Sequence, residues 1–151
     1  LVAHALMAMK LEFENRAKRP VKYIAFDGKA NSKWYSRSMA ILGTLILIFL
    51  ILHLSQFWWP TKVAVFNGEK ENSYGMVKDT LSNPFFSIAY VLAFIALGYH
   101  LLHGFQSAFQ SLGLNHKKYT PIIKSLGVAF SVVVPGLFAA IALAILFGLV
   151  K

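Results

Sequence analysis

Three long apolar blocks constrain this chain more than any other feature. They cover residues 38–59, 85–112 and 122–150, and each reaches the roughly 20 residues that a helix needs to cross a bilayer. With 57% hydrophobic residues, the chain carries far more apolar surface than one small globular core can bury. We therefore predict an all-α fold, a polytopic transmembrane helix bundle.

A fourth apolar block, LVAHALMAM, opens the chain. It has no initiator Met and no polar flank, so we interpret it as the end of a helix whose beginning, together with an earlier helix, is missing. It lacks the basic leader and the small-residue cleavage site of a signal peptide. The expected spans lie in one domain over residues 1–151, at about 1–13, 36–59, 84–112 and 121–150.

Turn and belt residues agree with these boundaries. The WWP stretch at 58–60 indicates an interfacial aromatic belt followed by a helix stop. The NP pair at 83–84 and the TP pair at 120–121 each place Pro in a first helical turn, where its missing N–H costs little. Gly113 stands where a helix C-cap is expected.

Charge differs between the loops and predicts an orientation. The loop over residues 10–38 holds eight Lys and Arg against three acids, and the loop after the third block holds Lys117 and Lys118, with Lys124 nearby and no acid. The loop between them balances three Lys against three acids. The positive-inside rule therefore places the two basic loops in the cytoplasm. The net charge of +9 then reflects topology and anionic lipid, and without a binding motif we expect no nucleic-acid partner.

Four of the five histidines lie in apolar blocks, and these are the candidate functional residues. They are His4, His53, His100 and His103, whereas His116 lies in a basic loop. Ionisable side chains inside a bilayer are costly and rare, so each one suggests a function. The alternative for an isolated histidine is a hydrogen bond to a neighbouring helix.

The depth of the histidines suggests a pairing. His4 lies eleven residues before Asn15, and His100 lies twelve before Leu112. At about 1.5 Å per residue, the two imidazoles fall at similar depth, where they can face each other across one ligand. His53 lies near the outer end of its helix, in a different layer. Single imidazoles from different helices suit bis-histidine ligation of haem iron.

The residues after His100 support this interpretation. Gly104 shares a helix face with His100, and its missing side chain allows a porphyrin to lie against the backbone. A polar stripe continues toward the cytoplasm and would face propionates, water or, as a nearly equal alternative, a neighbouring helix. This stripe consists of His103, Ser107, Gln110 and Ser111.

Two other metal chemistries fit the sequence poorly. A metal pair on His100 and His103 finds no carboxylate within the three long apolar blocks to complete a site. The chain has no cysteine, which excludes thiolate-bound iron–sulfur clusters and covalently attached c-type haem from it. The remaining candidate is non-covalent b-type haem.

Four segments, in this order, resemble a known family: VAHALMAMK, ENRAKRPVKY, SRSMAILGTLILIFLILHLSQFW and GYHLLHGFQSAFQSLGLNHKKY. They are similar to the dihaem cytochrome b membrane subunit of succinate:quinone and quinol:fumarate oxidoreductases. The resemblance implies five helices that hold two stacked b haems, with one ligand from each of the first four. The first helix would be the part missing here.

The resemblance also implies site residues. His4 and His100 would ligate the proximal haem, and His53 the distal haem, whose second ligand would lie outside this chain. His100 is preferred over His103 because the ligand in relatives has glycine four residues later, as Gly104 is here. His103 would then contact a propionate or support the site. Further residues around the haems, or alternatively simple topology charges, are Arg16, Arg19, Ser36 and Arg37.

One position departs from part of the family. Some fumarate reductases of this type have a glutamate, implicated in transmembrane proton transfer, two residues before this histidine. Here that residue is Gly98. That proton route is therefore not expected in this chain.

The implied function is electron transfer in the bacterial inner membrane. A flavoprotein subunit would oxidise succinate, an iron–sulfur subunit would dock on the basic cytoplasmic face, and the haems would carry electrons to menaquinone or another quinone. This chain would be the subunit of the enzyme that binds no dicarboxylate. One alternative is a quinol:fumarate reductase anchor, or another b-type haem anchor such as a hydrogenase or formate dehydrogenase subunit. A haem-free membrane anchor or transporter is the alternative of a different class, although the lack of acidic residues in the spans argues against proton coupling.

Overall fold

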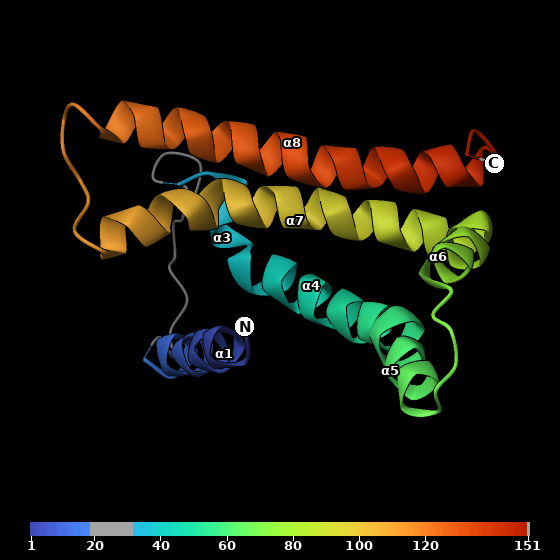
Figure 1. The fold of residues 1–151 in the computed structure, drawn as a ribbon. Helices are drawn as coiled ribbons and strands as arrows, with labels where there is room; N and C mark the ends of the chain where they lie inside the picture. The colour runs from blue at the N-terminus through green and yellow to red at the C-terminus, as the bar shows by residue number, and fades with distance from the viewer. Residues whose placement is uncertain (19–31, 151) are drawn as a thin grey trace.

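The computed structural model describes residues 1–18 and 32–150, and all regular elements in this part of the chain are helical. Three of its helical segments are long and apolar enough to cross a membrane: Met39–Phe66, Pro84–Ser111 and Thr120–Leu146. They form a bundle (Figure 1), so the predicted all-α membrane architecture is confirmed. The elements in chain order are α1 (Val2–Ala17), α3 (Trp34–Arg37), α4 (Met39–His53), the π-helical turn η1 (Leu54–Trp58), α5 (Trp59–Phe66), α6 (Ser73–Ser82), α7 (Pro84–Ser111) and α8 (Thr120–Leu146).

The helix stop predicted at residues 58–60 is wrong, because the chain continues in helical form to Phe66. The turn before Pro60 is π-helical, and the N–H of Trp59 bonds to the carbonyl of Leu54, five residues back. Pro60 therefore falls in the first turn of α5, where its missing N–H and its ring are tolerated. The chain bends here rather than stopping (Figure 1).

The ends of α7 follow the sequence signals. The Asn83 side chain accepts a hydrogen bond from the N–H of Phe85 at 2.9 Å, so it caps the helix that Pro84 opens. Gly113 adopts a positive φ of 74° after the last turn. The N–H of Leu114 then bonds to the carbonyl of Phe109 at 3.0 Å, which closes a Schellman motif.

Helices α7 and α8 run side by side (Figure 1) and approach closely through small residues. A Cβ added at Gly98 would lie 3.1 Å from the carbonyl oxygen of Ser131. Ser87 is fully buried and donates a hydrogen bond to the carbonyl of Ala142 at 3.2 Å. Small residues that permit close backbone approach are typical of helix contacts inside membranes.

A short helix that the sequence analysis did not predict closes one end of the bundle. Helix α6 lies in the loop between α5 and α7, and the side chain of Asn72 caps it by accepting from the N–H of Gly75 at 3.0 Å. Its buried Leu81 joins a core cluster with Tyr90, Ala142 and Ile145. The core therefore lies at the end of the bundle opposite the α7–α8 loop.

The Gly98 contact predicts a stability difference between two glycines of the bundle. Gly98→Val should lower the free energy of unfolding by about 1–3 kcal/mol, because the added side chain forces α7 away from α8. Gly136→Val is the matched control, because a Cβ there meets nothing within 4 Å. It should stay within about 0.5 kcal/mol of the wild type. Detergent-denaturation midpoints of the two variants measure this difference, and equal losses would contradict the packing account.

Candidate functional site

The structure brings His4 and His100 together, as their sequence depth predicted. Their ring centroids lie 6.2 Å apart and the ring planes are almost perpendicular, at 87°. His4 is on α1 and His100 on α7, and the two belong to segments almost a hundred residues apart in sequence. Helix α4 completes this layer, since a Cβ added at Gly43 would lie 3.6 Å from Cε1 of His100. The site is thus built from α1, α4 and α7.

His100 carries an unsatisfied buried nitrogen. Its Nδ1 is inaccessible to solvent and has no hydrogen-bond partner among the described residues. Nearly all buried polar side-chain atoms in folded proteins have a partner, and an exception points to a missing ion, water or ligand. A metal–imidazole bond is about 2 Å long, so two imidazoles on one metal ion place their ring centroids about 6 Å apart. The centroid distance between His4 and His100 is close to this value, and it also lies within the range of ordinary edge-to-face ring packing.

His103 has a different environment from His100, although it lies only three residues away. Its Nε2 is 3.1 Å from the hydroxyl of Ser107, one turn later on the same helix. The hydroxyl of Ser111 in turn donates to the carbonyl of Ser107 at 2.9 Å. His103, Ser107 and Ser111 of the predicted polar stripe are therefore hydrogen-bonded along their own helix, and His103 has a partner that Nδ1 of His100 lacks in the described part of the chain.

Gly104 faces the start of α4. The nearest atom to a Cβ added at Gly104 is the terminal methyl carbon of Met39, at 4.0 Å. A flexible methionine end can move aside more easily than backbone or a branched side chain. The backbone of α7 at Gly104 therefore remains approachable for a flat ring.

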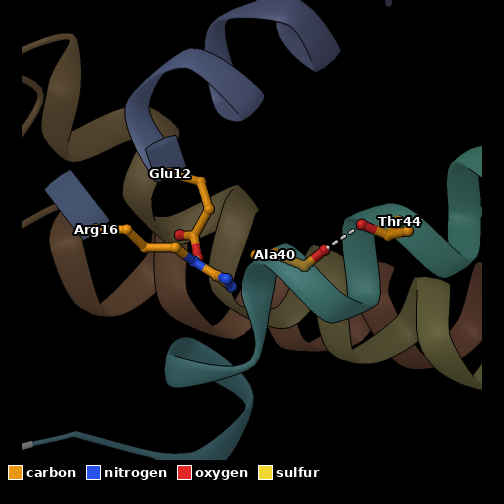
Figure 2. A network of polar contacts seen from close by, with 4 residues as sticks. All are labelled: Glu12, Arg16, Ala40 and Thr44. Atoms are coloured by element: carbon orange, nitrogen blue, oxygen red, sulfur yellow. Dashed lines mark hydrogen bonds and ion pairs between the residues drawn. The ribbon is translucent and has the colours of Figure 1, made fainter. Parts of the chain in front are cut away.

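The two described arginines expected around the site are engaged locally. Arg16 donates to Glu12 at 2.7 Å on the surface of α1 (Figure 2), and the same view shows Thr44 donating to the carbonyl of Ala40. Arg37 donates to the carbonyl and the hydroxyl of Ser32. Ser36 is half-buried in α3, and Arg19 lies outside the described residues.

His53 occupies a second layer, separate from His4 and His100. It is the last residue of α4, and its ring packs against Phe49, Phe57 and Tyr90, at centroid distances of 5.8, 5.2 and 6.0 Å. The hydroxyl of Tyr90 lies 3.4 Å from Nδ1 of His53 and 2.8 Å from Oε1 of Gln56. The second layer is thus an aromatic cluster with one short polar network.

Three residues of these layers were not predicted from the sequence. Gly43 is the single glycine of α4. Its closeness to His100 on another helix cannot be predicted from the residues around it in the sequence. Tyr90 and Gln56 are polar groups inside or beside apolar blocks, which was the available clue. Buried tyrosine hydroxyls normally have a hydrogen-bond partner.

Among residues 1–18 and 32–150, no group of three or more His, Cys, Asp or Glu side chains could hold a bare metal ion. A pair of imidazoles without carboxylates suits a metal whose other ligands come from a macrocycle, since haem iron takes only axial ligands from the protein. The residues present therefore fit haem better than a free ion.

Comparison with known proteins gives one match. The family model described as succinate dehydrogenase/fumarate reductase transmembrane subunit matches residues 15–139. This range contains His53, His100 and His103 and begins after His4. No curated protein and no solved structure is significantly similar to the chain.

Proposed function

Because the chain belongs to the succinate dehydrogenase/fumarate reductase transmembrane subunit family, we propose that it is the cytochrome b anchor of a succinate dehydrogenase. In this role it would bind two b haems and connect an iron–sulfur subunit to menaquinone or another membrane quinone. A flavoprotein subunit of the complex would carry out the dicarboxylate chemistry. The membrane would be the bacterial cytoplasmic membrane.

The observation that carries this proposal is the pairing of His4 with His100. The two rings approach to 6.2 Å from different helices, and the buried Nδ1 of His100 has no partner among the described groups. A histidine with a purely structural role would bond to a neighbouring group, as His103 bonds to Ser107 on its own helix. We therefore propose that His4 and His100 would hold the proximal haem, called the inner haem from here on, and that His53 would help to hold the distal haem, called the outer haem.

Haem, when bound, supplies an iron that carries one electron at a potential set by its axial ligands and surroundings. The protein's part is to position and tune it. Gly43 lets the backbone of α4 approach His100, and Gly104 has only the methyl end of Met39 near it, whereas the aromatic rings around His53 keep its surroundings apolar. His103 is proposed as a polar neighbour of the inner haem, and Arg16, Arg19, Ser36 and Arg37 as groups near the propionates.

The basic loops support the proposed docking side. The loops over residues 10–38 and 113–119 carry most of the excess positive charge, and α3, in the first of them, packs against α7 through Trp34 and Tyr99, whose ring centroids lie 4.7 Å apart. This contact fixes α3 beside the residue that precedes His100. An iron–sulfur subunit seated on this face would lie next to the inner layer.

Two other functions are consistent with the same family or fold. The same subunit can serve a quinol:fumarate reductase that runs in the opposite direction. The ratio of succinate oxidation to fumarate reduction by the complex would distinguish the two. A haem-free anchor would leave His4 and His100 as packing residues, and we disfavour it because Nδ1 of His100 has no partner among residues 1–18 and 32–150.

The first prediction separates His100 from His103 in the complex purified with its native partners. His100→Ala should remove the inner haem and halve the haem content, and His4→Ala should do the same. His103→Ala is the matched control and should retain both haems, because its ring already bonds to Ser107. Haem-to-protein ratios and reduced-minus-oxidised spectra measure this, with subunit assembly checked for each variant. Loss of haem from His103→Ala with retention in His100→Ala would contradict the assignment.

The second prediction concerns orientation. The chain has no cysteine, so single cysteines can report which loops face the cytoplasm. An impermeant thiol reagent applied to intact cells should label Lys70→Cys and not Lys117→Cys, whose loop is basic. Lys117→Cys should become reactive in detergent. The reverse labelling pattern in intact cells would show that the proposed topology is inverted.

A further inference from the structure

We propose that Tyr90 is a positioning residue for His53, which it holds in the tautomer that presents Nε2 to a metal. The inference rests on the proposed haem-binding function and adds a residue that tunes only the outer layer. Two observations support this role: a hydrogen-bond chain that joins His53, Tyr90 and Gln56, and the packing that immobilises Tyr90 and His53.

The hydrogen-bond chain has a defined direction. The Tyr90 hydroxyl donates to Oε1 of Gln56 at 2.8 Å. A phenol has a single O–H hydrogen, so once it is given to Gln56, the same oxygen can only accept from His53. The 3.4 Å contact to Nδ1 of His53 is therefore an Nδ1–H donating to Tyr90. The proton on Nδ1 leaves the lone pair of the neutral ring on Nε2.

Nε2 of His53 is available for a ligand. Within residues 1–18 and 32–150, no side chain or backbone group forms a hydrogen bond with it. A neutral imidazole binds a metal through the nitrogen that carries no proton, and the hydrogen bond at the other nitrogen sets which one that is. The Tyr90 contact thus selects Nε2.

Packing prevents Tyr90 from swinging away. Its side chain is only 3% exposed and lies in the core cluster with Leu81, Ala142 and Ile145. The ring of Phe49 contacts Tyr90 edge-on, at a centroid distance of 4.8 Å, and contacts His53 in a tilted arrangement, at 5.8 Å. The donor and the acceptor are therefore held by the same rigid part of the fold.

The backbone around His53 is also specialised. The π-helical turn η1 begins at the next residue and carries Gln56. Single π-helical turns inside helices are frequent at functional sites. Here the turn places the end of the hydrogen-bond chain on the same segment that carries the histidine, so His53, Tyr90 and Gln56 form a closed unit across α4, η1 and α7.

The two layers differ in this respect. Among the described residues, the Tyr90 hydroxyl is hydrogen-bonded to His53 and Gln56 and to neither His4 nor His100. A hydrogen bond accepted from a ligating histidine raises the basicity of that ligand, and a more basic ligand favours the oxidised metal. Removing the Tyr90 hydroxyl should therefore affect the outer haem and leave the inner haem unchanged.

The test is a redox titration of the purified complex with four variants. Tyr90→Phe removes the hydroxyl and keeps the ring, so the midpoint potential of the outer haem should rise and its affinity should fall about 10-fold, as for other outer-shell partners of a metal ligand. Gln56→Leu should shift the potential in the same direction by less. The double variant should match Tyr90→Phe, because Gln56 acts through Tyr90. Tyr119→Phe, at a residue 54% exposed in the distant loop, should change nothing.

The outcomes distinguish this inference from the proposed function. If the wild type shows an outer haem that His53→Ala removes, but Tyr90→Phe shifts neither haem or shifts both equally, the positioning role is wrong and the proposed function stands. Additive shifts in the double variant would also overturn it. If the wild-type complex contains no haem, both proposals fail together. Gln56→Leu leaves the packed Tyr90 ring in place, so it gives the answer even if Tyr90→Phe assembles poorly.

Discussion

An imidazole inside a bilayer needs a partner, and this requirement organises the whole bundle. Water is absent there, so an unsatisfied polar group costs several kcal/mol. His103 meets the requirement with Ser107 and His53 meets it with Tyr90. His100 does not meet it among the described groups, although it lies beside His4 and against Gly43. The proposed haem iron would account for that difference with residues that the chain already contains.

The rest of the fold supports this arrangement. Helices α7 and α8 approach closely at Gly98 and Ser87, so α8 packs against α7 on the side away from α4. The core cluster around Tyr90 joins α6, α7 and α8 at the end of the bundle opposite the α7–α8 loop, and α3 packs against the middle of α7 through Trp34 and Tyr99. Helix α7, which carries His100 and Tyr90, is therefore held in place near both histidine layers.

Much of this architecture could be predicted from the sequence, and the errors have physical causes. The apolar blocks, the Asn83 cap and the Gly113 terminus are local features, and the predicted boundaries of α7 follow from them. The WWP stretch suggested a stop, but a π turn moved Pro60 into a tolerated position. Helix α6 lies in a polar loop with several charged residues, and its short amphipathic pattern was not recognised as a helix there. The pairing of His4 with His100 was predictable because depth follows from counting residues, whereas Gly43 and Tyr90 depend on contacts between helices, which no local pattern encodes.

The measurement that tests the central claim most directly is the haem-to-subunit ratio of the complex isolated with its native partners, combined with its reduced-minus-oxidised spectrum. The account predicts two b haems for each copy of this chain, reducible by succinate, with one lost when His100 is replaced. A complex that oxidises succinate with its subunits intact but contains no haem would contradict it. His4 and His100 would then be packing residues in the bundle.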